Sequence, residues 1–172
     1  MKFSDILLAI LHAQAIITQL RLRVKDDDLI ETTCRKTSNY RLCVSTLRAD
    51  PCSATADVPG LGLIMVDAVR AKAETALSAI SEQWLLHPEQ RQALEHCTAA
   101  YEAVLKADVP EAVVGLRKGV PKFAEFGMSD AAWEAEICQG NFEKWMESPL
   151  SQVNQDLREL ALVATAIIRE LL

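Results

Sequence analysis

The most constraining feature of this chain is the helical spacing of its apolar residues. From residue 57 onward they recur every three or four positions in four long segments, which is the period of one helix face. One such stripe consists of Leu61, Ile64, Met65, Ala68, Val69, Ala73, Ala76 and Ile80. The connections between the segments are short. The sequence therefore predicts an all-α fold in which four amphipathic helices form an up-down-up-down four-helix bundle.

Turn-forming residues mark where the first two helices should begin and end. Asp57 and Pro59 suit the cap and the first turn of the first helix. His87-Pro88 should interrupt the chain and start a second helix, which Asp108-Val109-Pro110 either kinks or restarts. Gly119 is a fitting C-terminal cap, because glycine readily adopts the left-handed conformation that ends many helices.

The third and fourth helices have start signals of their own. Pro121 should stop the second helix, and Ser129 should cap a third helix over about 130–146. Ser148-Pro149 should then open the fourth, with Ser as the cap and Pro in the first turn. The apolar residues of both helices are expected in the core, and those of the third are Trp133, Ile137 and Trp145.

Composition agrees with one helical domain and narrows the possible partners. A chain of 172 residues can bury a substantial core, and half of its residues are hydrophobic. Six Gly and six Pro are few for a β-sandwich. The net charge of −6 comes without a basic stripe, so nucleic acid is not an expected partner. No apolar run approaches the length of a membrane span, so no membrane association is expected.

The N-terminal segment reads differently from the rest of the chain. An apolar run covers residues 6–11 and continues at Ile16-Ile17, and Ala13-Gln14-Ala15 fits a small-x-small cleavage site. Residues 1–25 are therefore expected to be a secretory signal or N-terminal extension, with an ordinary amphipathic helix as the alternative. The functional domain is expected over 26–172.

Five cysteines raise the question of disulfides: Cys34, Cys43, Cys52, Cys97 and Cys138. Two bridges would leave one thiol over. Cys34 and Cys43 bracket the turn signal Thr37-Ser38-Asn39, so their bridge would clasp short helices at about 29–36 and 39–48. This hairpin, over about 28–50, would precede the bundle at about 57–172. Spacing alone does not choose between Cys34–Cys43 and Cys43–Cys52, and five reduced, buried cysteines are a further alternative.

The chain offers little catalytic chemistry. It has no Glu-x-x-His pair for a di-iron bundle and no His-Glu-x-x-His motif for zinc. His96 and Cys97 are adjacent on a helix, where neighbouring side chains point about 100° apart and do not face each other. We therefore expect a protein that is not an enzyme and that needs no cofactor or metal.

Pro121-Lys122-Phe123 is the most distinctive tripeptide. It places a cation beside an aromatic ring between two helical segments, and we expect it to form a loop. A small bundle that presents such a tip is suited to plugging a pocket of another protein. The simpler alternative is a helix stop followed by a Phe that anchors in the core.

Several stretches resemble the plant invertase and pectin methylesterase inhibitors. They are residues 29–34, Tyr40-Arg41-Leu42-Cys43, residues 63–68, Ala93-Leu94-Glu95-His96-Cys97, Tyr101 and Pro121-Lys122-Phe123-Ala124-Glu125. Cys138 stands where the family's fourth bridged cysteine is expected. The resemblance covers about residues 28–172, and the order of the motifs and the cysteine spacing agree with it.

The resemblance implies a structure, a partner and a location. It implies a four-helix bundle with an N-terminal hairpin, disulfides Cys34–Cys43 and Cys97–Cys138, and a free thiol at Cys52. The tripeptide is similar to the invertase branch, which implies that Pro121, Lys122 and Phe123 enter the active-site mouth of an acid invertase and compete with sucrose. A monomer secreted to the apoplast, cell wall or vacuole is expected. The alternative is a pectin methylesterase inhibitor that uses a different helical surface.

Overall fold

The computed structural model describes residues 10–14, 16, 18, 29–145 and 147–172. Most of the signal or extension predicted over 1–25 lies outside these residues. Residues 29–34 are helical. The chain continues through α2 (Tyr40–Ala49), a 3₁₀ turn (Pro51–Thr55), α3 (Val58–Leu86), a second 3₁₀ turn (Pro88–Gln90), α4 (Arg91–Ala103), a π-helical turn (Val104–Asp108), α5 (Val109–Arg117), α6 (Pro121–Gly140) and α7 (Ser151–Arg169).

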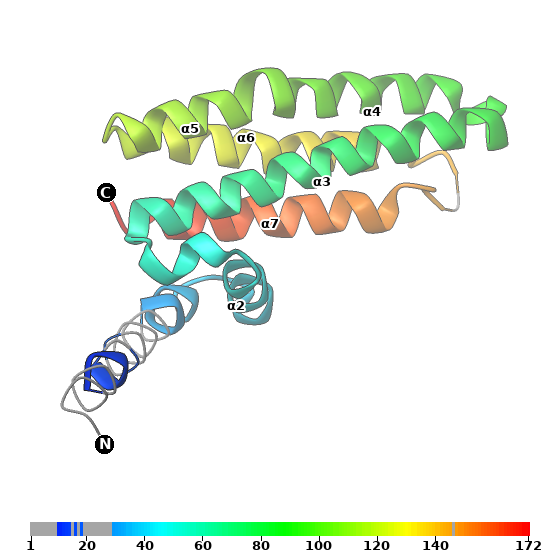
Figure 1. Ribbon diagram of the computed structural model, residues 1–172. Coiled ribbons are helices and arrows are strands. Elements are labelled where there is room, and N and C mark those ends of the chain that lie inside the picture. The colour runs from blue at the N-terminus through cyan, green and yellow to red at the C-terminus, as the bar shows by residue number, and fades with distance from the viewer. Residues whose placement is uncertain (1–9, 15, 17, 19–28, 146) are drawn as a thin grey trace.

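Four antiparallel rods form the body of the molecule (Figure 1). α3 is the first, α4 and α5 with the π-helical turn between them form the second, and α6 and α7 follow. The turn between α5 and α6 lies at the same end of the bundle as the start of α3 and the C-terminus (Figure 1). The predicted all-α up-down-up-down bundle is therefore confirmed.

The start of α3 follows the predicted capping. The Asp57 carboxylate accepts a hydrogen bond from the backbone N–H of Gly60 at 2.9 Å, and Pro59 lies in the first turn. This satisfies one of the backbone donors that a helix start leaves without a partner. The predicted stripe of α3 is buried except for the half-buried Ala68.

The sequence left open whether Asp108-Val109-Pro110 kinks or restarts the second helix. The structure has a π-helical turn there. Proline cannot donate a backbone hydrogen bond, and its ring crowds the preceding turn. Here the helix widens over Val104–Asp108 and continues directly into α5. α4 and α5 therefore act as one rod, and the widened turn carries the buried Asp108.

The predicted start of the third bundle helix is wrong. α6 begins at Pro121 and runs without interruption to Gly140, so Ser129 lies inside the helix rather than at its cap. The helix buries a face of mostly small residues: Ala124, Glu125, Gly127, Met128, Ala131, Ala132, Ala135 and Cys138. Trp133 points away from this face and is 61% exposed, so its predicted place in the core is also wrong. Ile137 is partly exposed. Trp145 is half-buried and packs against the core.

The fourth bundle helix starts slightly later than predicted. α7 begins at Ser151, with Leu150 at the cap position. The Ser148 hydroxyl accepts a hydrogen bond from the N–H of Leu150 at 3.2 Å, so it stabilises the approach to the helix rather than the helix itself. The apolar residues of this helix that were expected in the core are buried in it or pack against it: Leu150, Val153, Leu157, Leu160, Ala161, Ala164, Ile167, Ile168 and Leu171.

Two disulfides join elements of the fold. Cys34–Cys43 clasps the N-terminal hairpin with Cα atoms 5.5 Å apart, and Cys97–Cys138 joins α4 to α6 with Cα atoms 4.6 Å apart. α2 packs against α3 and α7, so the hairpin is attached to the bundle. Cys52 lies exposed in the first 3₁₀ turn and is not bonded to another cysteine.

Candidate protein-binding site

The turn between α5 and α6 is closed by backbone hydrogen bonds. Gly119 has φ of +67°, and its N–H donates to the carbonyl of Leu116 at 3.2 Å. The N–H of Val120 donates to the carbonyl of Gly115 at 2.8 Å. This pair of bonds is a Schellman motif, which needs a left-handed residue at the position of Gly119. The predicted cap at Gly119 is confirmed, and the connection is only three residues long.

The prediction that Pro121-Lys122-Phe123 forms a loop is wrong. These three residues form the first turn of α6. Val120 is the N-cap, and Pro121 is the first helical residue. Proline suits this position because its N–H would have no partner there and its fixed φ is already helical. Lys122 and Phe123 therefore project from a helix end rather than from a flexible segment.

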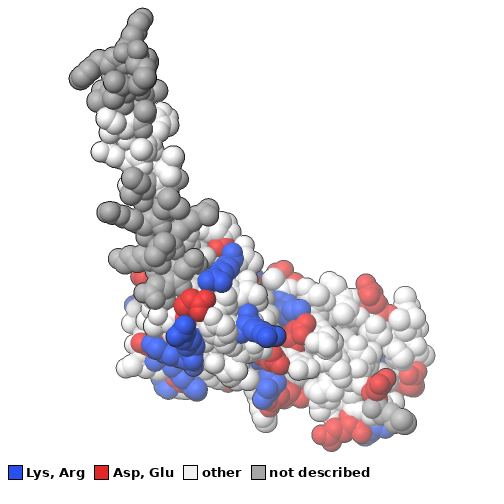
Figure 2. Space-filling model, turned by 90° about the horizontal axis from the view of Figure 1, so that it is seen from below, with Lys and Arg blue, Asp and Glu red and all other residues white. Residues whose placement is uncertain are grey.

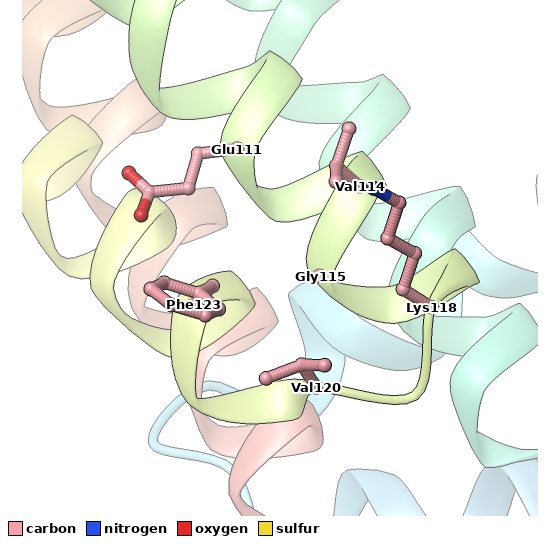
Figure 3. A pocket seen from close by; sticks show the side chains of 6 residues that line it. All are labelled: Glu111, Val114, Gly115, Lys118, Val120 and Phe123. Carbon is pink, nitrogen blue, oxygen red and sulfur yellow. The ribbon is translucent and has the colours of Figure 1, made fainter.

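Phe123 borders an open cleft between α5 and α6 (Figure 3). Its side chain is 53% exposed, which argues against a Phe that anchors in the core. The cleft has a volume of about 280 Å³ and a mostly apolar lining. It is formed by Glu111, Val114, Gly115, Lys118, Val120 and Phe123. An apolar hollow beside an exposed ring is a surface suited to a side chain of another protein.

Gly115 allows the two helices to approach closely at the bottom of this cleft. A Cβ atom at Gly115 would lie 2.7 Å from the backbone nitrogen of Ala124. A separation that short does not occur between real Cβ atoms and backbone, so any larger residue would push α6 away. Gly115 therefore helps to fix where the first turn of α6 lies.

Lys122 is held by a charge network at the start of α6. Its ammonium lies 2.5 Å from Oε2 of Glu125 and 4.8 Å from the centre of the Phe126 ring. The other carboxylate oxygen of Glu125 accepts a hydrogen bond from Nε of Arg169, the last residue of α7, at 2.7 Å. The hydrogen bonds from Lys122 and Arg169 lower the pKa of Glu125, so this carboxylate stays ionised in mildly acidic solution.

A second acidic group with a shifted pKa lies on the π-helical turn. The Asp108 side chain is buried, and its Oδ2 has no hydrogen-bond partner among the described residues. Burial raises the pKa of Asp108 to about 7, and the nearby charges of Asp130, Glu134 and Glu111 add to the shift. No sequence motif marks Asp108 as a functional residue. Its burial is signalled only by its position one turn after Val104 on the buried face.

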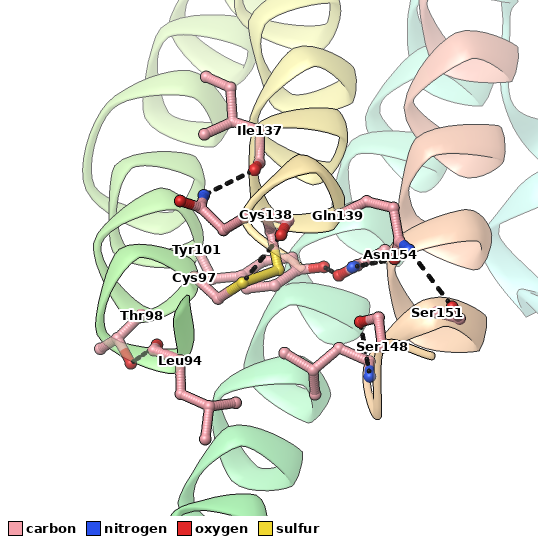
Figure 4. The surroundings of a disulfide bond; sticks show 12 residues. Leu94, Cys97, Thr98, Tyr101, Ile137, Cys138, Gln139, Ser148, Ser151 and Asn154 are labelled. Carbon is pink, nitrogen blue, oxygen red and sulfur yellow. Dashed lines mark hydrogen bonds between the residues drawn. A yellow bond between two sulfur atoms is a disulfide. The ribbon is translucent and has the colours of Figure 1, made fainter. Parts of the chain in front are cut away.

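The opposite part of the bundle holds a polar cluster around the second disulfide (Figure 4). The buried Tyr101 hydroxyl donates to Asn154, whose amide donates to Gln139 at 2.8 Å. These bonds satisfy buried polar groups and tie α4, α6 and α7 together. Cys97 is bonded to Cys138, so it has no thiol for catalysis with His96.

Within the described part of the chain, no group of three or more His, Cys, Asp or Glu side chains is arranged to hold a metal ion. In the same residues, no helix combines the length and the apolar character needed to cross a membrane. On the face shown in Figure 2, most Lys and Arg side chains lie toward the hairpin end of the bundle, and Asp and Glu dominate the far end.

These features define a disulfide-stabilised helical bundle with a charged and aromatic surface at one end. The family model for plant invertase/pectin methylesterase inhibitors matches residues 28–167, and the chain belongs to this family.

Individual relatives agree with this assignment. The chain is 40% identical over 144 residues to the cell wall / vacuolar inhibitor of fructosidase 1 of Arabidopsis thaliana, covering 84% of this chain and 69% of that protein. It is 31% identical over 153 residues to a putative invertase inhibitor of Platanus acerifolia, covering 83% and 84%. A mutant form of a pectin methylesterase inhibitor from Arabidopsis shares the fold, with a TM-score of 0.70 at 21% identity over 81% of this chain and 95% of that chain.

Proposed function

We propose that this chain inhibits an acid invertase by placing the first turn of α6 at the mouth of the enzyme's active site, in competition with sucrose. The observation that carries the proposal is the 40% identity, over most of the chain, to a protein named as an inhibitor of fructosidase. A second relative, at 31% identity, is named as a putative invertase inhibitor. On this account the chain is an inhibitor and has no catalytic activity of its own.

The chemistry of the target suits this contact. A retaining glycoside hydrolase holds two carboxyl groups close together at the bottom of its pocket. Lys122 offers an ammonium to such a pocket, and the exposed Phe123 ring offers an apolar face beside it. Pro121 fixes the start of the helix, so little conformational entropy is lost when the tip docks.

The remaining structure supports a rigid presentation of the tip. The Schellman turn, the close approach at Gly115 and the ion pairs of Glu125 all restrict the first turn of α6.

Two disulfides are typical of proteins that fold in oxidising compartments. We therefore infer a secreted protein that acts in the apoplast, cell wall or vacuole, as the name of the 40% identical relative suggests. We further propose that it acts as a monomer.

Inhibition of a pectin methylesterase is the second candidate. The matching family contains both kinds of inhibitor, and the structural neighbour with a TM-score of 0.70 is a pectin methylesterase inhibitor. On this alternative another helical surface makes the contact, and the exposure of Lys122 and Phe123 is incidental.

A paired assay separates the two candidates. The purified protein is titrated against an acid invertase and, separately, against a pectin methylesterase. We expect the invertase to lose activity, with the inhibition relieved by added sucrose, and the methylesterase to remain active. Inhibition of the methylesterase alone would establish the second candidate in place of the first.

A further inference from the structure

We propose that Glu125 is a positioning residue for the invertase contact: its buried carboxylate holds the Lys122 ammonium in the orientation in which it meets the enzyme. This inference rests on the proposed function and adds a residue to it that makes no contact with the enzyme itself.

Glu125 is buried, whereas its two cationic partners, Lys122 and Arg169, are exposed. The Glu125 side chain is only 8% exposed, whereas those of Lys122 and Arg169 are 55% and 61% exposed. A charged group loses solvation when it is buried, so a buried carboxylate is retained only with partners. Here one partner approaches each carboxylate oxygen, at 2.5 Å and 2.7 Å. Glu125 is thus a fixed point to which two exposed cations are attached.

The backbone explains why this fixed point acts on Lys122. The two residues are three positions apart in the first turns of α6, so their side chains lie on the same side of the helix. Phe126 lies under the ammonium, with the nitrogen 4.8 Å from the ring centre. A lysine side chain has a large rotamer entropy, and ordering it on binding weakens affinity. In this chain the ordering occurs before binding.

Arg169 keeps the arrangement suitable for an acidic pocket. Two cations and one anion leave the cluster with a net positive charge, so Glu125 does not cancel the attraction that Lys122 exerts. A lysine ammonium has three donors. One of them is used by Glu125, and the exposed remainder of the group is available to a carboxylate of the enzyme.

A double-mutant cycle with acid invertase tests the proposal. The inhibition constant is measured for wild type, Glu125→Gln, Lys122→Ala and the double variant, with circular dichroism and thermal unfolding to confirm the fold. We expect Glu125→Gln to raise the inhibition constant about three- to tenfold in the wild-type background, which matches the entropy of ordering one side chain. In the Lys122→Ala background the same change should have little effect, because Glu125 acts only through Lys122.

Glu136→Gln is the matched control. Glu136 also lies on α6 and also pairs with an arginine of α7, Arg158, but nearer the other end of the helix. Its replacement should leave the inhibition constant unchanged. If Glu125→Gln does not fold, Glu125→Asp tests the same point. It keeps the negative charge but draws the carboxylate back by one methylene from the position where it meets Lys122, and it should also weaken inhibition.

The outcomes are distinct. Unchanged or stronger inhibition by a folded Glu125 variant would overturn the positioning role. Equal effects of Glu125→Gln in the wild-type and Lys122→Ala backgrounds would also overturn it, because they would indicate a general structural role. If Lys122→Ala itself inhibits as well as wild type, the proposed contact fails, and the positioning role fails with it.

Discussion

Gly127 on α6 lies directly against the backbone carbonyl of Asp108 on the π-helical turn. A Cβ atom at Gly127 would be 2.4 Å from that carbonyl oxygen and 3.2 Å from the nitrogen of Ala112. Together with Gly115, this glycine sets the distance between α6 and the rod formed by α4 and α5. Both contacts involve backbone atoms, which cannot move aside as a flexible side chain can.

Gly127→Ala should therefore destabilise the protein. Forcing α6 away from the π-helical turn is an overpacking change, and we expect a loss of about 1–3 kcal/mol in the free energy of unfolding. Urea denaturation measures it. Gly140→Ala, at the end of the same helix, is the control, because the nearest atom to its added Cβ is 4.0 Å away. Equal stability of the two variants would show that the close contact is not a constraint.

Asp108 should make the protein less stable as the pH rises. Its pKa is raised to about 7 in the folded protein, so between pH 4 and 7 the folded state binds a proton that the unfolded state releases. The stabilisation is complete below the unfolded pKa near 4 and is lost as the pH rises through about 7. It amounts to at most about 4 kcal/mol.

Asp108→Asn removes this titration, so the variant's stability should depend less on pH and should exceed that of wild type at pH 8. Unfolding free energies at pH 4.5, 6 and 8 measure the effect. The exposed Asp67, replaced by Asn, is the control. Parallel pH profiles for wild type and Asp108→Asn would contradict the role assigned to the buried carboxyl.

The two disulfides should differ in their contribution to stability. By loop-closure entropy, Cys97–Cys138 contributes roughly 4 kcal/mol and Cys34–Cys43 roughly 2.7 kcal/mol, because the first closes a longer loop. Replacing each pair by Ala and measuring the unfolding free energy should reproduce this order.

Alkylation of the oxidised protein followed by mass mapping should label Cys52 alone. A peptide that joins Cys43 to Cys52 would overturn this pairing.

The sequence predicted the long helices well because their caps and stripes act locally. Asp57 caps α3 and Gly119 ends α5 as expected, since each depends on the conformation of a few neighbouring residues. Pro121 was ambiguous for a physical reason: a proline that stops one helix is equally suited to the first turn of the next. The sequence therefore drew attention to Pro121, Lys122 and Phe123, but it did not predict their helical setting.

α6 was harder to predict because its pattern of hydrophobicity is misleading. The face that it buries is made largely of Ala and Gly, which carry little apolar contrast, whereas Phe126 and Trp133 are exposed. A pattern that weighs large apolar residues therefore points to the wrong face. The ion pair between Glu125 and Arg169 joins residues 44 positions apart, so no local signal predicts it.

The inhibition constant of the Lys122→Ala/Phe123→Ala double variant tests the central claim most directly. Each single change is expected to reduce the binding free energy by at least about 2 kcal/mol, or roughly 30-fold in affinity. Lys122→Ala leaves a buried enzyme carboxylate without its partner, and Phe123→Ala removes an aromatic contact. Lys106→Ala, an exposed lysine on the π-helical turn that pairs with Glu102, is the control.

The measurement is a titration against acid invertase at several sucrose concentrations, with circular dichroism to confirm the fold of each variant. We predict that the double variant stays folded and that its inhibition constant is at least a hundredfold higher than that of wild type. Lys106→Ala and wild type should have equal inhibition constants, and added sucrose should relieve the inhibition by both. A folded double variant that inhibits as strongly as wild type would contradict the account.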